Sequence, residues 1–266
     1  MTWQHYPYYL IIVLALWIAG LIFLYIPGKR YTRISQILLF LGFGVLAVFT
    51  IQLWVNLERP PFRSLGETRL WYGIFLSVVG LVLYHLWKFK WILLYSKTIA
   101  AIFLLIICFK PGTFDQTLMP ALQSPWFIPH VIVYIFAYAL LTAATIIAAK
   151  ELYLFWKNKN SDKSAKESLV YADNLVYIGL AFLTFGLLFG ALWAKEAWGH
   201  YWTWDPKETW SLITWLVYLL YIHFRHRHKG KYIIPFWILI FAMIFLLICW
   251  FGVNYLPSTQ SSIHTY

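Results

Sequence analysis

Residues 198–215 of the chain read WGHYWTWDPKETWSLITW, and the rest of the sequence is organised around this stretch. It carries five tryptophans, two acidic residues, a lysine and a histidine between two long apolar segments. An interfacial aromatic belt explains about one or two tryptophans per helix end. It does not explain Trp198, Trp202 and Trp204 beside Gly199, whose missing side chain permits close approach. We therefore interpret the stretch as a binding surface for a flat, amphipathic ligand.

The second half of this stretch predicts the start of a helix. Asp205 suits the N-cap, Pro206 the first helical position and Glu208 the third, where its carboxylate can reach back to the cap. Such a helix directs its positive, amide-rich end toward the tryptophans, where it can receive an anionic group. The same residues therefore have both a structural and a functional interpretation.

The composition indicates a polytopic membrane protein. The 266 residues are 62% hydrophobic, 21% aromatic and only 12% charged, which is too apolar for a soluble domain of this size. The net charge of +11 is then a matter of membrane topology, and no nucleic-acid partner is expected. Cys108 and Cys249 form neither a CxxC nor a CxxCH motif, so the chain is neither a thiol–disulfide enzyme nor a c-type cytochrome.

The predicted fold is an all-α membrane protein with about eight spans. A span needs about 20 apolar residues, and Lys97 within the fourth is expected to extend toward the interface. The expected spans cover residues 9–27, 34–55, 70–87, 91–109, 129–149, 174–194, 210–224 and 233–251. The polar stretch 158–168 reads as a linker between the fifth and sixth spans.

The basic residues predict how the chain is oriented. Fifteen of the 21 fall in or beside alternate loops, which should therefore be cytoplasmic. Both termini and the tryptophan stretch are then external, facing the periplasm or a lumen, with lipid around the spans. On the external side, Arg59, Arg63 and Arg69 can pair with anionic groups such as haem propionates, or with lipid headgroups.

Four histidines are candidate ligands. Pro129 places His130 in the first turn of the fifth span, at its external end. His264, near the end of the chain, is expected on the same face and can approach from the opposite direction. His85 and His223 lie inside apolar spans, where an ionisable residue indicates a functional site by default. Both fall at similar depth and can form a second bis-histidine site, although each side chain can instead reach the nearby interface.

Residues 194–210, AKEAWGHYWTWDPKETW, closely resemble the WWD signature of haem-handling proteins. Together with YIHFR at 221–225, they are similar to the CcsA (ResC) family of the System II pathway for cytochrome c biogenesis. The resemblance is strongest from about residue 126 onward. It divides the chain into N-terminal spans (residues 1–128) and a haem-handling core (residues 129–266) that contains the WWD loop (residues 195–215).

The resemblance implies that haem b moves through the membrane to the external WWD surface. An apocytochrome c then presents CxxCH, and its thiols form thioethers with the haem vinyl groups, so the chain would be a component of a holocytochrome c synthase of the haem lyase type. The partner would be a CcsB (ResB) protein, and the membrane either the bacterial inner membrane or the thylakoid. No general acid or base is assigned. The implied axial ligands are His130 and His264 outside and His223 within the membrane, and His85 is the candidate in this chain for the second ligand beside His223. The implied haem-holding residues are Trp198, Gly199, Trp202, Trp204, Asp205, Glu208 and Trp210.

Three alternatives remain. A CcmC-like exporter or chaperone would pass haem on without making thioethers, but the DPKET motif and eight spans favour CcsA. A bis-histidine electron-transfer cytochrome b would place its histidines on helices facing each other rather than beside a tryptophan loop. A transporter for another amphipathic substrate is the third.

Overall fold

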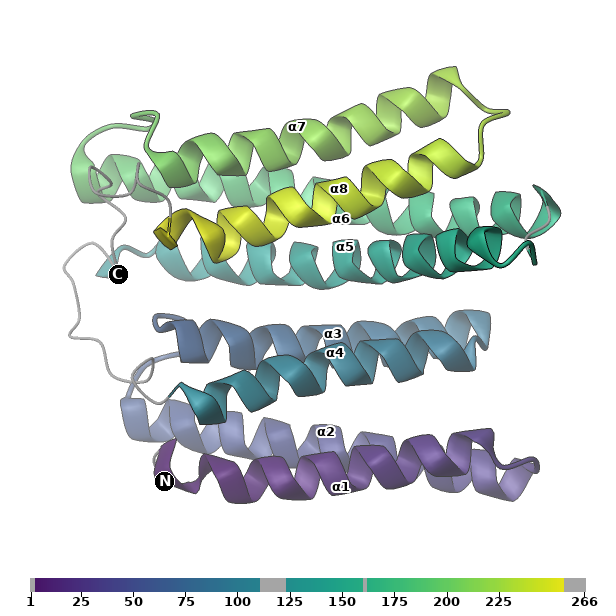
Figure 1. Cartoon of the computed structure of the whole chain (residues 1–266). Helices are drawn as coiled ribbons and strands as arrows, with labels where there is room; N and C mark the ends of the chain where they lie inside the picture. The colour runs from purple at the N-terminus through teal and green to yellow at the C-terminus, as the bar shows by residue number, and fades with distance from the viewer. Residues whose placement is uncertain (1–2, 111–122, 160–161, 256–266) are drawn as a thin grey trace. The chain divides into compact units, whose positions relative to one another are not determined.

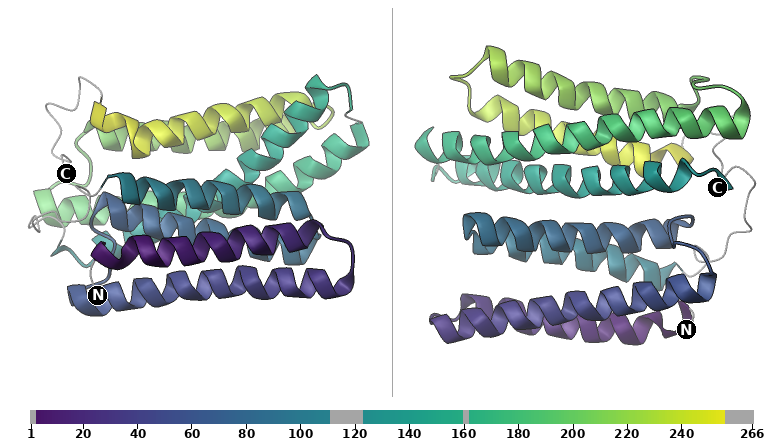
Figure 2. Two further views of the ribbon diagram at one scale, coloured as in Figure 1. Left: turned by 60° about the horizontal axis from the view of Figure 1, so that its bottom comes forward. Right: turned by 180° about the vertical axis from the view of Figure 1, so that it is seen from behind.

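The computed structural model describes residues 3–110, 123–159 and 162–255, and within these ranges the chain forms eight long helices and no strand. The chain divides into two compact units, Met1–Thr117 and Leu118–Tyr266. The first unit contains α1–α4 and the second α5–α8, and in each unit consecutive helices run antiparallel (Figures 1 and 2). The all-α architecture predicted from the sequence is confirmed. The functional division at residue 128 stays a prediction.

In the first unit, short turns join four helices of 20 to 29 residues. Gly28 at φ +128° and Lys88 at φ 59° reverse the chain at two of these turns. Tyr6 donates a hydrogen bond of 2.9 Å to the backbone oxygen of Leu104, which joins the first helix to the fourth. The helices are α1 (Tyr6–Tyr25), α2 (Lys29–Leu57), α3 (Leu65–Trp87) and α4 (Lys90–Phe109), preceded by the short helix η1 (Trp3–His5).

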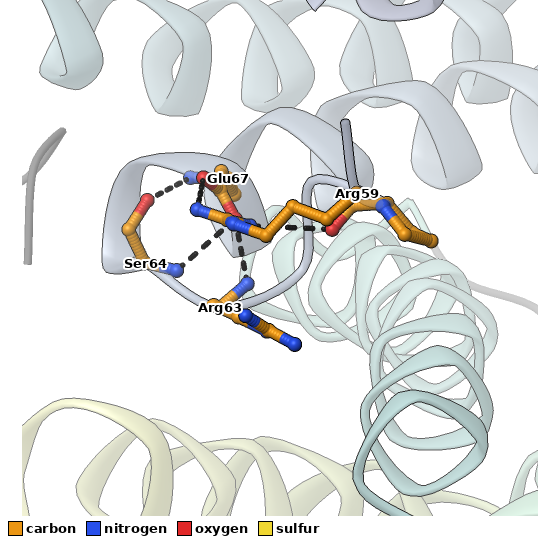
Figure 3. A network of polar contacts seen from close by, with 5 residues as sticks. Arg59, Arg63, Ser64 and Glu67 are labelled. Carbon is orange, nitrogen blue, oxygen red and sulfur yellow. Dashed lines mark hydrogen bonds and ion pairs between the residues drawn. The ribbon is translucent and has the colours of Figure 1, made fainter. Parts of the chain in front are cut away.

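The turn before α3 is held by one buried carboxylate, that of Glu67 (Figure 3). Ser64 and Glu67 form a reciprocal capping box, with bonds of 3.1 and 3.2 Å. Arg59 donates two hydrogen bonds, of 2.9 and 3.0 Å, to the same carboxylate, and the backbone N–H of Arg63 adds a third contact of 2.6 Å. Burial and the nearby positive charge of Arg59 lower the pKa of Arg63. Because the Arg59 guanidinium binds the carboxylate of the capping box, Arg59 helps to hold the start of α3.

Lys97 differs from expectation because it does not extend toward the interface. Its side chain is buried inside the first unit, hydrogen-bonded to Ser77 of α3. Its ammonium lies 4.2 Å from the centre of the Trp17 ring on α1. A cation–π contact and a hydroxyl together replace part of the lost hydration. These partners lie on other helices and so could not be inferred from the neighbouring residues in the sequence.

In the second unit, α5 (Phe127–Trp156) and α6 (Asp162–Trp198) form a closely packed antiparallel pair. The contacts keep one register, because each step forward along α5 is matched by an equal step back along α6. Small residues let the helix backbones approach: a β-carbon at Gly179 would stand 2.7 Å from Leu141. The facing pairs are Phe127 with Trp193, His130 with Gly190, Tyr134 with Gly186, and Leu141 with Gly179.

The linker predicted at residues 158–168 is shorter than expected. Helix α6 already begins at Asp162, so most of the polar stretch is helical. Ala165 and Leu169 are buried in the same register as the apolar residues that follow. Ser168 also donates a 2.8 Å hydrogen bond to the buried carboxylate of Glu151 on α5. This part of α6 is amphipathic and buries only a narrow stripe of residues, so its many polar residues were interpreted as a linker.

Helices α7 (Pro206–Arg227) and α8 (Ile233–Trp250) complete the second unit, followed by the short helix η4 (Gly252–Tyr255). Trp215 donates its indole N–H to Thr184 of α6 at 2.9 Å. Nearer the other end of α7, Arg225 forms an ion pair of 2.7 Å with Asp173, which also accepts a 2.7 Å bond from Tyr221. Polar contacts at two levels thus fix the rotation of α7 against α6.

Among the residues that the structure describes, seven of the eight long helices are long and apolar enough to cross a membrane, and α7 is the exception. Their outward faces are apolar: Ile11, Ile18 and Ile22 on α1 are each more than half exposed. A surface of this kind suits lipid rather than water. The chain is therefore an integral membrane protein. Helix α7 has charged residues near both ends, and its passage through the membrane stays a prediction.

Candidate functional site

Within the tryptophan stretch, residues 199–205 form the loop between α6, which ends at Trp198, and α7, which begins at Pro206. It begins at Gly199, whose φ of +85° is strained for any residue with a side chain. Lys195, in the last turn of α6, donates a 2.8 Å hydrogen bond to the carbonyl of Gly199 and lies 5.4 Å from the centre of the Tyr201 ring. The glycine and the lysine together close α6 and turn the chain into the loop.

The predicted start of α7 is confirmed. Asp205 is the N-cap, with Pro206 as the first helical residue, and its side chain accepts a 2.9 Å bond from the N–H of Lys207. Glu208 completes the capping box by accepting from the N–H of Asp205 at 3.2 Å. One oxygen of Glu208 also accepts from the N–H of Thr203 at 2.7 Å. Glu208 therefore holds the loop as well as the helix.

Trp204 lies between the two backbone N–H groups that Glu208 binds. Its φ of 60° is left-handed, a conformation that costs a bulky residue about 1–3 kcal/mol. The contacts of Glu208 on both sides offset this cost. The result is a Trp204 ring that is 67% exposed and meets Trp202 edge to face at 5.8 Å. The indole N–H of Trp202 is buried and has no acceptor among the described residues.

Below this loop, an aromatic cluster joins the end of α6 to the start of α5. Trp193 and Phe127 form its buried centre, with ring centres 5.1 Å apart. Trp198 packs against Trp193 at 5.0 Å, and His130 lies 5.5 Å from Trp193 on the other side. Trp193 therefore connects the predicted ligand His130 with the first tryptophan of the motif.

His130 is held in place by its neighbours. Its Nδ1 lies 2.9 Å from the carbonyl oxygen of Gly186 on α6, and Tyr134 packs edge-on against its ring at 4.7 Å. Nearby, Ser124 donates a 2.6 Å bond to Glu196 and accepts one of 3.2 Å from the N–H of Trp126. These contacts fix the first turn of α5 against the last turns of α6.

The other predicted residues lie apart from this cluster or are not described. Trp210 packs against Phe245 of α8 at 6.0 Å. His223 lies exposed on α7, well along the helix from the loop, with its Nδ1 2.9 Å from the carbonyl of Leu219. His85 is exposed in the first unit, within reach of the carbonyl of Leu81, and its pairing with His223 stays a prediction. His264 lies outside the described residues.

The sequence interpretation missed three residues of α6 that surround His130. Gly186, Gly190 and Trp193 fall on one face of the helix, at spacings of four and three residues. That spacing is visible in the sequence, but two glycines in an apolar span usually indicate helix packing alone. Only the register between α5 and α6 shows that the face lies against His130.

Comparison with known proteins identifies the family to which the chain belongs. A family model described as cytochrome C assembly protein matches residues 63–260. This chain belongs to the cytochrome c assembly family. A relative from Chlamydomonas reinhardtii, named cytochrome c biogenesis protein CcsA, is 33% identical over 255 residues, which cover 91% of this chain and 70% of the relative. Relatives with the same name from Guillardia theta and Prochlorococcus marinus are each 30% identical, over 90% and 80% of this chain and 89% and 78% of their own lengths.

Membership in the cytochrome c assembly family assigns the chain a role in cytochrome c maturation. The matched region begins in the turn before α3 and includes all of α5, α6, α7 and α8, so it contains both the loop and the His130 cluster. The family also implies that the protein handles haem.

Proposed function

We propose that this protein brings haem b to the external face of the membrane and presents it to an apocytochrome c for thioether formation, acting with a CcsB (ResB) partner. The proposed axial ligands on that face are His130 and His264, and His223 would bind haem within the membrane. The observation that carries the proposal is the position of His130, which lies beside Trp193; Trp193 in turn packs against Trp198, the last residue of α6 before the tryptophan loop.

The residues around this position fit the chemistry of haem. Imidazole is a common axial ligand of haem iron, and the ring of His130 is already held by its Nδ1 contact. Exposed Trp204 and half-buried Trp202 offer aromatic faces for a flat macrocycle. The buried indole N–H of Trp202 is a donor that a propionate can satisfy, and α7 directs its positive N-terminus toward the same loop.

The protein's part in the reaction is then to position and protect the substrates. Each thioether forms when a cysteine S–H adds across a vinyl C=C bond: sulfur bonds to one carbon, hydrogen goes to the other, and no net oxidation occurs. Orientation of two reactants accounts for a large share of rate acceleration in such a step. The tryptophan loop and the two histidines would provide that orientation, and no side chain need act as a general acid or base.

The test is an absorption spectrum of the protein purified in detergent together with its CcsB partner. Wild type is compared with His130→Ala, His264→Ala and His223→Ala, and maturation of a reporter cytochrome c is measured in the same cells. We expect a low-spin bis-histidine spectrum in wild type. Loss of either external histidine should turn it high-spin or remove the haem, and abolish maturation. His223→Ala should lower the amount of haem that reaches the external site.

Other results would overturn parts of the proposal. Normal maturation in His130→Ala would exclude His130 as an essential ligand. A haem spectrum that survives both external substitutions and disappears only with His223→Ala would favour an electron-transfer cytochrome b. If wild type binds haem through His130, but His130→Ala loses that haem and still forms thioethers normally, the protein acts as an exporter or chaperone.

A further inference from the structure

The backbone of α6 makes a contact with His130 that packing alone does not require. The ring nitrogen Nδ1 of His130 lies 2.9 Å from the carbonyl oxygen of Gly186. A carbonyl oxygen can only accept a hydrogen bond, so Nδ1 must carry the hydrogen. In the neutral ring the lone pair then belongs to Nε2. The structure thereby determines which nitrogen of His130 is available as a ligand atom.

Gly190 is what opens this carbonyl to His130. In an α-helix the N–H of residue 190 points at the carbonyl of residue 186, so the side chain at position 190 lies beside that oxygen. A β-carbon at Gly190 would stand 2.8 Å from Cε1 and 2.9 Å from Nδ1 of His130. Both distances are below van der Waals contact, so any side chain at position 190 would push the imidazole away from the Gly186 carbonyl.

Gly186 contributes a second constraint on the same ring. A β-carbon there would stand 2.6 Å from the Tyr134 ring, one turn along α5 from His130. Because Gly186 has none, Tyr134 can lie close to α6 and pack edge-on against His130 at 4.7 Å and 71°. On the other side, Trp193 is tilted against the imidazole at 38°. The plane of the imidazole is thus limited by rings on two sides, while its Nδ1 is held by the helix backbone.

We infer that Gly186 and Gly190 are positioning residues that set the tautomer and orientation of His130 as a haem ligand, an inference that rests on the proposed function. A hydrogen bond from the second ring nitrogen orients a ligating imidazole and raises its basicity, and loss of such a partner typically weakens binding by about 10- to 100-fold. A more basic ligand favours the oxidised iron, so this contact also tunes the reduction potential of the bound haem.

The chain offers a matched control for close helix packing. Gly179 occupies the same register of the α5–α6 pair, 11 residues before Gly190, and a β-carbon there would stand 2.7 Å from Leu141. Gly179→Ala therefore imposes a similar steric conflict between the same helices, at a position remote from His130. If glycines matter only for packing, Gly179→Ala and Gly190→Ala should behave alike.

The first experiment compares wild type, Gly190→Ala, Gly179→Ala and His130→Ala, each purified with its partner subunit. Haem affinity, spin state, reduction potential and thermal stability are measured for each. We expect Gly190→Ala to bind haem about 10- to 100-fold more weakly, with a partly high-spin spectrum and a raised potential. Gly179→Ala should lose stability but keep the spectrum and potential of wild type. Equal effects of the two alanines, or a wild-type spectrum and potential in Gly190→Ala, would overturn the inference.

A second experiment does not depend on how Gly190→Ala folds. In His130→Gly, imidazole added to the medium can both bind iron and donate N–H to the Gly186 carbonyl, whereas 1-methylimidazole has no N–H to donate. We expect imidazole to restore the low-spin spectrum at roughly tenfold lower concentration, a factor worth about 1.4 kcal/mol. Equal potency of the two molecules would contradict a role for the carbonyl. A wild-type spectrum in His130→Ala would instead contradict the proposed ligand itself.

Discussion

At the scale of single residues, Glu208 does more than cap a helix. Its Oε2 accepts from Thr203 and Asp205, the residues on either side of Trp204. This arrangement requires the left-handed backbone at Trp204 and so directs that ring away from the protein. The exposed aromatic face therefore depends on a carboxylate that is itself buried.

Substitution of Glu208 tests this dependence. Glu208→Ala should lower stability by roughly 2 kcal/mol, since it removes the capping box and the contacts that hold the loop. Glu208→Gln retains an oxygen that can occupy the position of Oε2 and should lose less. Thermal unfolding in detergent measures the stability of wild type and of both variants. Equal stability of wild type and Glu208→Ala would show that the loop is held by other contacts.

The sequence was most informative where the determining contacts are local. Asp205 and Glu208 were predicted correctly because a capping box lies within four consecutive residues. Lys97 was not, because its environment is supplied by Trp17 and Ser77 on other helices. The same holds for His130: its place in the first turn of α5 was expected, but its contact with Gly186, 56 residues away, depends on the helix register.

At the scale of helices, the lengths of α5 and α6 exceed what a membrane needs. At 1.5 Å per residue, the 37 residues of α6 extend about 55 Å and the 30 of α5 about 45 Å, against a hydrocarbon core of about 30 Å. The spans predicted at residues 129–149 and 174–194 lie within these helices, but each helix extends beyond its span at both ends. Hydropathy detects only the apolar centre, whereas the helices continue on amphipathic faces.

The rotation of α7 should depend on its ion pair with α6. Asp173 and Arg225 are each 14% exposed, and removal of one partner from a buried pair is strongly destabilising. We expect Arg225→Asp to cost roughly 3 kcal/mol by placing two carboxylates together. The exchanged pair, Asp173→Arg with Arg225→Asp, should recover part of this loss, but not all, because Tyr221 also donates to Asp173.

Thermal unfolding in detergent and the yield of folded protein measure both variants. If the exchanged pair is no more stable than Arg225→Asp alone, the attraction between the two side chains is not what holds α7. Trp215→Phe, which removes the hydrogen bond to Thr184 and part of the ring that carries it, provides a comparison at the other level of contact between α6 and α7.

At the scale of the whole molecule, the distribution of basic residues predicts that the tryptophan loop is external and the α7–α8 turn cytoplasmic. Tyr201 and Lys229 are exposed and represent the two sides. With Cys108 and Cys249 replaced by serine, Tyr201→Cys should react with a membrane-impermeant maleimide added to intact cells. Lys229→Cys should react only after permeabilisation, and the reverse pattern would invert the proposed topology.

The contacts around Trp204 also bear on how such a loop can be transferred between proteins. The acceptor that shapes residues 203–205 lies in the first turn of α7 and the lysine that binds Gly199 in the last turn of α6, so the loop keeps these contacts when residues 195–208 are moved together. A graft of the tryptophans alone would leave them on an ordinary flexible connection. A pair of antiparallel helices can therefore carry such an exposed aromatic loop if the first helix is followed by a glycine and the second begins with this Asp-Pro-x-Glu capping box.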